Sequence, residues 1–282
     1  MSLPIDSLEK IIAENSDDFI FDSNIIADSI FSRYIYDCPE ISDMDMGIVK
    51  EERRYIQKID EIFLNFSNVY TIKEVSEEKN RFLQLCNEKY EWFKKKSKTD
   101  DAENLECFKQ FNSDVFEMIK TVKKKLLKPN DKIYNKILQC TNLLSKEYEL
   151  YTDYSKSTNS YGKRGEKRTD FQYLGTDEKL IAATFHRALI EKKDVSLVTK
   201  DQRMWSKFSL VYSVTTNDEI INKIDDLKKY NLKIIGLVEG DTEFNIKRQT
   251  KKLNEKYPHA NGAENIDYLK KFKNEIEGIL KA

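Results

Sequence analysis

Acidic residues stand where predicted strands end and where a predicted helix begins. Asp22 ends the apolar segment at residues 18–22, and Asp201 lies just past the apolar segment that ends at Thr199. Asp177 opens a predicted helix. Ligands of mostly parallel α/β sheets bind outside the carboxyl ends of the strands. We therefore expect Asp22 and Asp201 to project at the edge of the sheet where a ligand would bind.

Asp177 lies on the helix face that the sequence predicts to be buried. Its spacing aligns it with Ile181, Thr184 and Ala188 at intervals of three and four residues. An aspartate in the first turn can simply favour the helix dipole. An aspartate aligned with a buried stripe, however, needs a partner that compensates its charge, and a metal ion is a good candidate.

A second predicted helix has an acid on its apolar face. Glu78 shares a stripe with Val75 and Phe82, whereas Glu77 shares a stripe with polar residues, which indicates a solvated face. We therefore choose Glu78 rather than Glu77 as the fourth acid of the site. Glu74 leans towards the same stripe and is a reserve candidate.

The four acids together predict a divalent-metal site. Converging carboxylates repel each other, so a cation is needed between them. A ligand set of oxygens alone suits Mg²⁺ or Mn²⁺ rather than zinc. Such a metal lowers the pKa of a bound water and clamps a phosphate. Each acid taken singly is more simply a helix cap or a surface charge, and only the set of four points to a metal.

Alternating strands and helices would position these acids. This alternation predicts an α/β fold with a mostly parallel sheet. Strands are predicted at residues 18–22, 68–72, 195–199, 210–214 and 232–238. Helices are predicted from Ser23 or Asn24 through Tyr34, at 50–66, from Glu74 to the break at Pro129, from Asn130 or Asp131 to Tyr148, from Asp177 to about Lys193, at 217–230, and as a polar pair from Glu243.

A polar segment at residues 153–170 has no helical or strand period and predicts a mobile loop. Tyr154 and Tyr161 lie in it among clustered cations, and this combination suits single-stranded nucleic acid. A basic loop without a binding function is an equally good interpretation. The candidate nucleic-acid-binding residues of this loop are Lys163, Arg164, Lys167 and Arg168.

The composition limits the function classes. The net charge of the 282-residue chain is −1, so nothing global indicates a nucleic-acid-binding protein. Two histidines and four cysteines without a C-x-x-C pair disfavour a zinc knuckle and histidine-based acid–base chemistry. No apolar window approaches the length of a membrane span, and the first residues lack the pattern of a secretory signal. We expect a cytoplasmic protein without a membrane partner.

Four segments resemble, in order, the motifs of the PIN-domain family of nucleases: FIFDSNI, YTIKEVSEE, GTDEKLIAATF and VSLVTKDQRM. The resemblance implies a PIN-like three-layer α/β/α fold and a metal-dependent nuclease. It assigns hydrogen-bonding support to Asn24 and Thr199. It implies that a metal-activated water attacks the phosphodiester bond. The acids that would hold one or two metals are Asp22, Glu78, Asp177 and Asp201.

The resemblance also predicts the domain organisation. It places a PIN-like domain at residues 17–214, after an N-terminal segment at 1–16. The chain departs from the family by a long inserted helical block at about 79–170 and by a C-terminal α/β extension at 215–282. The expected activity is a Mg²⁺- or Mn²⁺-dependent endonuclease that cuts RNA or single-stranded DNA, RNA first. The alternative is an inactive PIN-like scaffold that binds nucleic acid or protein, and the helical block is the candidate surface for a protein partner.

Overall fold

The chain divides into two compact units in the computed structural model. The first comprises Met1–Lys128, Val198–Lys200 and Gly236–Thr242, and the second comprises Pro129–Leu197, Asp201–Ile235 and Glu243–Ala282. The structure describes residues 4–27, 29–151, 175–201, 204, 207–208, 211, 232–236 and 244–245.

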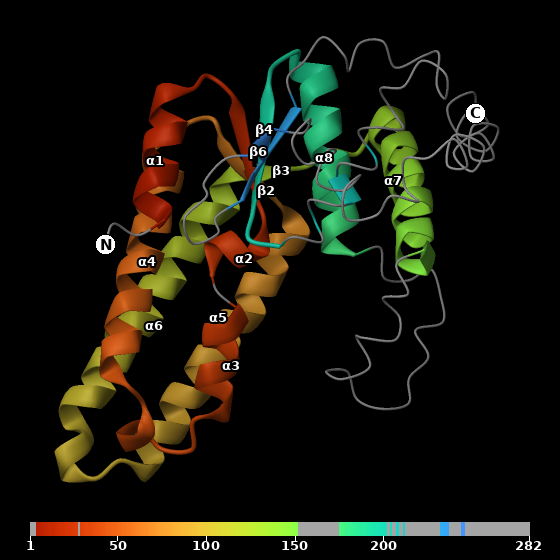
Figure 1. Cartoon of the computed structure of the whole chain (residues 1–282). Coiled ribbons are helices and arrows are strands. Elements are labelled where there is room, and N and C mark those ends of the chain that lie inside the picture. The colour runs from red at the N-terminus through yellow and green to blue at the C-terminus, as the bar shows by residue number, and fades with distance from the viewer. Residues whose placement is uncertain are drawn as a thin grey trace. The chain divides into compact units, whose positions relative to one another are not determined.

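Helices make up most of the described chain (Figure 1). None of those in the described ranges has both the length and the apolar character needed to cross a lipid bilayer. The helices are α1 (Pro4–Glu14), α2 (Ser23–Ile26), α3 (Ser29–Asp37), α4 (Met46–Asn65), α5 (Lys73–Lys96), α6 (Ala102–Val122), α7 (Lys132–Tyr151) and α8 (Thr176–Glu191), with short 3₁₀ turns η1 (Ile41–Asp43), η2 (Thr99–Asp101) and η3 (Lys123–Lys125). The strands are β1 (Asp18–Phe21), β2 (Val69–Ile72), β3 (Leu126–Leu127), β4 (Val195–Thr199), β5 (Leu232–Gly236) and β6 (Phe244–Asn245).

The strands form one sheet in the order β3-β2-β1-β4-β5-β6. The pairs β1–β2 and β2–β3 are parallel, and β5–β6 is antiparallel. All residues of β1 and β4 are buried, as expected for parallel strands covered on both faces. The α/β class and the mostly parallel sheet are thus confirmed, and they are compatible with a three-layer α/β/α fold.

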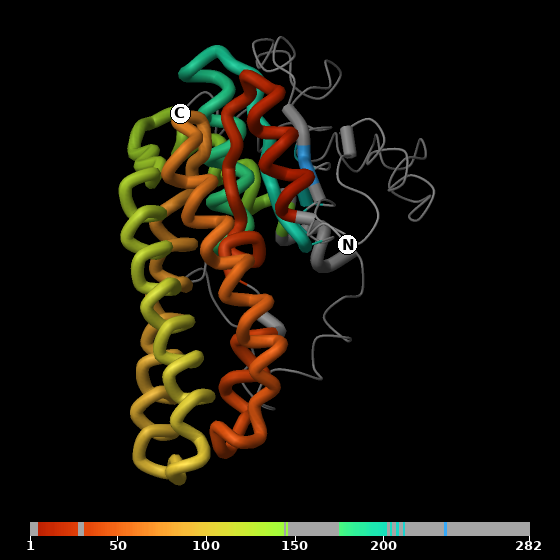
Figure 2. The backbone as a smooth tube through the Cα atoms, turned by 90° about the vertical axis from the view of Figure 1, so that its left-hand side faces the viewer, coloured from red at the N-terminus to blue at the C-terminus, as the bar shows by residue number. Residues whose placement is uncertain are grey.

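Long helices of the first unit pack along one another. Helix α4 lies against α6, and α6 lies against α5 (Figures 1 and 2). Aromatic rings fill the space between them: Phe93 of α5 and Phe108 of α6 meet edge to face at 5.4 Å between ring centroids. On the other side of α6, Arg53 of α4 forms an ion pair with Asp114 of α6 at 2.6 Å. Apolar burial and this ion pair together fix α6 between its two neighbours.

The helix predicted from Ser23 or Asn24 through Tyr34 is interrupted. Helix α2 ends at Ile26, and Ala27 is extended, with φ −156° and ψ 136°. The buried ammonium group of Lys79 donates to the Ala27 carbonyl oxygen at 3.0 Å, so this carbonyl has a partner outside the helix. The sequence also favours Ser23 or Asn24 as the cap of this helix, and this is wrong, because Asp22 itself caps α2 and accepts from the Ser23 amide at 2.5 Å.

The sequence pattern shows no sign of β3. Its two residues lie in a stretch with a predicted helix up to Pro129, yet Leu126 lies opposite Thr71 of β2. Helix α6 ends before this strand, and the three lysines of η3 lie between the two elements. A strand of two residues is too short to show an alternation of apolar and polar side chains.

Two predictions in the C-terminal part are wrong. Val211 is helical and not part of a strand at 210–214, and β6 replaces the start of the polar helix pair. The predicted helix at 217–230 lies outside the described residues. The first error has a physical reason, because the buried positions before and at Val211 recur at the helical interval of three and four residues. These buried helical residues are Met204, Lys207, Phe208 and Val211.

Candidate functional site

Asp22 lies directly after β1, where the sequence predicts a ligand-binding acid. The residue is only 3% exposed. Its backbone amide donates to the Val198 carbonyl oxygen of β4 at 2.9 Å. The hydroxyl group of Thr199 donates to the Oδ2 atom of Asp22 at 2.6 Å. The carboxylate is therefore fixed in direction by donors from both its own helix and the neighbouring strand.

Asn24 connects to the same group through its side chain. Its Nδ2 atom donates to Thr199 Oγ1 at 3.3 Å, and its Oδ1 atom accepts from the Lys200 amide at 2.9 Å. Because the Thr199 oxygen accepts from Asn24, its own proton is directed to Asp22, and successive hydrogen bonds in one direction strengthen each other. The supporting positions expected for Asn24 and Thr199 are thus occupied by hydrogen-bonded side chains.

Glu78 lies in the first two turns of α5, which begins directly after β2. It is half-buried, as is Glu74, whereas Glu77 is exposed and pairs with Lys73 at 3.2 Å. The choice of Glu78 over Glu77 therefore agrees with burial. The neighbouring Lys79 ties this part of α5 to Ala27, which follows α2.

Asp177 and Asp201 belong to the second unit. Asp177 lies in the first turn of α8, and burial raises the pKa of its carboxyl group. The ammonium group of Lys207 opposes this shift in the pKa, while the negative charges of Glu178 and Asp201 add to it. Asp177 thus lies close enough to both carboxylates to repel them. Its position offers a cation more stabilisation than a solvated carboxylate would.

Sequence reasoning missed Glu178 and Lys207. The Glu178 side chain is 11% exposed, and the Lys207 Nζ atom lies 2.8 Å from its Oε1 atom and 3.3 Å from Oδ2 of Asp177. The hydroxyl group of Ser145 on α7 donates to the same Glu178 oxygen. Burial alone would raise the pKa of Glu178, but the Lys207 charge and these hydrogen bonds outweigh it and lower the pKa.

A periodic signal for Glu178 is present in the sequence. Glu178 aligns with Ala182 and Phe185, and both are fully buried. Gly175 supports the same arrangement, because a Cβ atom at that position would overlap the Glu178 carboxylate. Glu178, the second acid of the segment GTDEKL, therefore faces inward, as Asp177 does. This is possible because α8 is buried on more than one face.

The donor set suits Mg²⁺ or Mn²⁺ in its chemistry, since it consists of oxygen atoms. Burial raises the pKa of Asp177 most, and the charges of Glu178 and Asp201 add to this shift against Lys207, so a cation beside Asp177 would offset part of the cost of its charge. Among the described residues, no group of three acidic, histidine or cysteine side chains is close enough to hold a metal ion. Asp22 and Glu78 belong to the first unit, and Asp177 and Asp201 belong to the second. In each pair the carboxylate oxygens are ligands of the type that Mg²⁺ and Mn²⁺ prefer.

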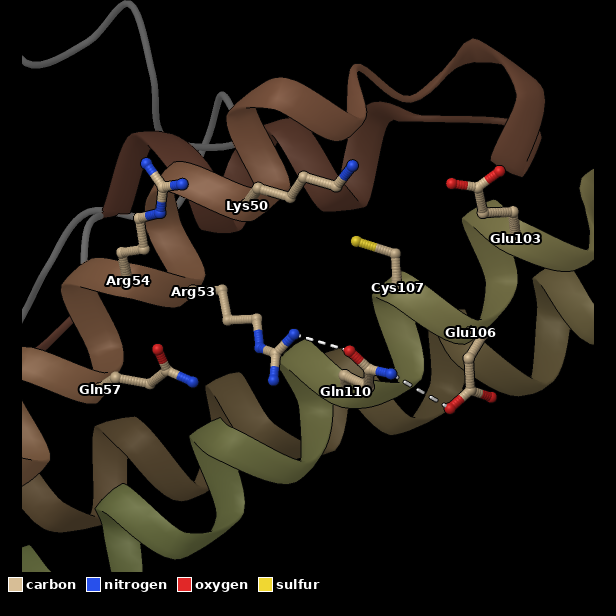
Figure 3. A pocket seen from close by; sticks show the side chains of 8 residues that line it. All are labelled: Lys50, Arg53, Arg54, Gln57, Glu103, Glu106, Cys107 and Gln110. Atoms are coloured by element: carbon tan, nitrogen blue, oxygen red, sulfur yellow. Dashed lines mark hydrogen bonds between the residues drawn. The ribbon is translucent and has the colours of Figure 1, made fainter.

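A separate pocket of about 600 Å³ lies between α4 and α6. Figure 3 shows Arg53 directed to Gln110 across it, and the two side chains are hydrogen-bonded at 2.6 Å. None of the four predicted acids lines it. Its walls carry both signs of charge, which favours no single class of ligand. The lining residues are Lys50, Arg53, Arg54, Gln57, Glu103, Glu106, Cys107 and Gln110.

The predicted basic loop at 153–170 lies outside the described residues, including Lys163, Arg164, Lys167 and Arg168. Comparison of the chain with models of protein families, with curated proteins and with solved structures finds no match.

Proposed function

We propose that the chain is a Mg²⁺- or Mn²⁺-dependent endonuclease with a PIN-like fold, acting on RNA before DNA. The observation that carries the proposal is the buried carboxylate of Asp22, oriented by Thr199 at 2.6 Å. It lies at the carboxyl end of a parallel strand, which is where α/β sheets bind ligands. The proposed metal-binding acids are Asp22, Glu78, Asp177 and Asp201.

The residues around Asp22, together with Asp177, have separable roles in the proposed reaction. A bound metal supplies an activated water and stabilises charge on the phosphate. The Thr199 and Ser23 donors hold the Asp22 carboxylate in one orientation before any ligand arrives. A carboxylate has about four lone-pair sites, so two hydrogen bonds do not by themselves prevent it from binding a metal. Asp177 would contribute a second, half-buried negative charge.

A catalytically inactive scaffold that binds nucleic acid or a protein is the second candidate. One observation favours it: the ammonium group of Lys207 already pairs with both Asp177 and Glu178 without a metal. In such a protein the acids would serve the fold alone. The exposed faces of the helical block would then be the surface for a partner.

A cleavage assay separates the two candidates. End-labelled RNA and single-stranded DNA are incubated with the purified protein in Mn²⁺, in Mg²⁺ or in EDTA. The nuclease proposal expects products with metal only, and none from Asp22→Asn. Asp100→Asn is the matched control, because Asp100 is an exposed aspartate of the first unit outside the proposed site. Metal-independent cleavage, or equal cleavage by Asp22→Asn, would rule out the proposed site.

A further inference from the structure

The position of Lys207 is determined by the packing of its apolar neighbours. Its side chain is 9% exposed, and its neighbour Phe208 packs on Phe185 of α8 with ring centroids 5.3 Å apart. Met204 and Val211, one turn away on either side, are buried. The packing of these apolar residues fixes the backbone at Lys207 beside α8, which keeps the ammonium group within reach of both carboxylates.

Among the described residues, the ammonium group of Lys207 pairs with two carboxylates at unequal distances. Its Nζ atom lies 2.8 Å from Glu178 and 3.3 Å from Asp177. Ser145 donates to the same oxygen of Glu178 and so orients that carboxylate. Glu178 is also the more deeply buried of the two acids, at 11% against 31% exposure of the side chains. Glu178 is therefore the anchor of Lys207, and Asp177 is the partner that is easier to release.

We infer that Lys207 is a built-in counterion that competes with a divalent cation for Asp177, while Glu178 is a positioning residue that retains the ammonium group. The inference rests on the proposed function only in taking Asp177 as a metal ligand. A cation near Asp177 must overcome repulsion from Lys207, and this repulsion is strong where solvent is largely excluded. Lys207 would thus limit metal affinity, so that the two neighbouring acids do not bind every available cation.

Direct measurement of Mn²⁺ binding tests this competition. Free Mn²⁺ is measured by electron paramagnetic resonance during titration of each protein at neutral pH, without nucleic acid. Lys207→Met is expected to bind Mn²⁺ about tenfold more tightly than wild type, because a repelling charge is removed. Lys207→Gln should behave in the same way and keeps a hydrogen-bond donor for Glu178, while Lys207→Arg should resemble wild type. Far-UV circular dichroism verifies folding.

The control variant is Lys120→Met, which removes the same charge from an exposed position on α6. Its affinity should remain that of wild type. Glu178→Gln alone should weaken Mn²⁺ binding, because the Lys207 ammonium loses its charged partner Glu178 and is left to pair more strongly with Asp177. Added to Lys207→Met, Glu178→Gln should weaken binding less than it does in wild type, because only the through-space loss of its negative charge near Asp177 remains. A decrease as large as in wild type, or larger, would make Glu178 a metal ligand and would overturn its positioning role.

The outcomes separate this inference from the nuclease proposal. The inference is overturned if wild type binds Mn²⁺ and both Lys207→Met and Lys207→Gln bind it equally or more weakly. The nuclease proposal would still stand in that case. Binding by the variants alone supports the inference and contradicts a metal-dependent wild-type enzyme. Absence of binding in every protein overturns both.

Discussion

The hydroxyl group of Thr199 lies 2.6 Å from the Oδ2 atom of Asp22, although 177 positions separate the two residues in the chain. The neighbouring strands β1 and β4 bring them together. Both residues are buried, so neither group can exchange its partner for bulk water without local opening. An unpaired buried carboxylate is costly, and the Thr199 donor is therefore part of what allows an acid to exist at this position.

Replacing Thr199 with valine keeps the side-chain shape and removes the donor. We expect the free energy of unfolding to fall by about 1–3 kcal/mol. Nuclease activity should fall as well, because Asp22 is no longer held in its orientation. Thr199→Ser, which keeps the hydroxyl group, should retain most of both. Urea unfolding and cleavage are measured on the same preparations, and a Thr199→Val protein equal to wild type in both would contradict the role of this hydrogen bond.

Asp22→Asn and Asp177→Asn are expected to abolish cleavage and to leave the fold intact. The substitution keeps the shape of the side chain and removes a charge that a metal needs. For Asp177 the melting temperature should rise slightly or stay constant, since burial and the charges of Glu178 and Asp201 disfavour the ionised form and raise the pKa. Cleavage and melting are measured together. Full activity in both folded variants would remove the basis of the proposed site.

The first half of this site could be predicted from sequence because its signals are local. A short apolar run ending in Asp22 and another ending in Thr199 each define a buried strand with a polar residue at its end. The pairing of Lys207 with Glu178 spans 29 positions, and no local pattern encodes such an ion pair. Residues 210–214 also resemble a strand because they are rich in apolar and β-branched residues, although Val211 is helical.

The Glu178–Lys207 pair predicts a specific pH dependence of stability. The pKa of Glu178 in the folded protein is lowered, against an unfolded value of about 4.3. Ionised Glu178 thus stabilises the fold above that pH, and this contribution disappears as the pH falls through the folded pKa. Glu178→Gln should lower the free energy of unfolding at neutral pH by on the order of 3 kcal/mol.

The test of this dependence is urea unfolding of wild type and Glu178→Gln over a range of acidic pH. The difference between the two proteins should shrink as the pH falls below about 4. A difference that stays constant over the whole range would show that Glu178 acts through packing and not through its charge.

The predicted basic loop gives an expectation about substrate binding. Neutralising its four cations should weaken nucleic-acid binding. It should also flatten the plot of log affinity against log salt by about 0.7 for each phosphate of a single strand that is no longer neutralised. Neutralising Lys94, Lys95 and Lys96 at the exposed end of α5 is the control and should leave the slope unchanged. An unchanged slope in the loop variant would place the nucleic acid elsewhere. The loop residues to be changed are Lys163, Arg164, Lys167 and Arg168.

Mn²⁺ is expected to stabilise the folded protein, and this effect should depend on the same acids. Carboxylates held near one another repel, and the unfolded chain avoids that repulsion. A cation that binds only the folded state stabilises it by RT ln(1 + [L]/Kd), which is about 2.7 kcal/mol at a hundredfold excess over Kd. Melting curves are recorded with increasing Mn²⁺ on wild type and on Asp22→Asn combined with Asp201→Asn. A saturable rise in Tm in wild type alone supports the metal site. Equal shifts in both proteins would show nonspecific ion binding, because the double variant lacks two of the four proposed ligands yet would respond to Mn²⁺ as wild type does.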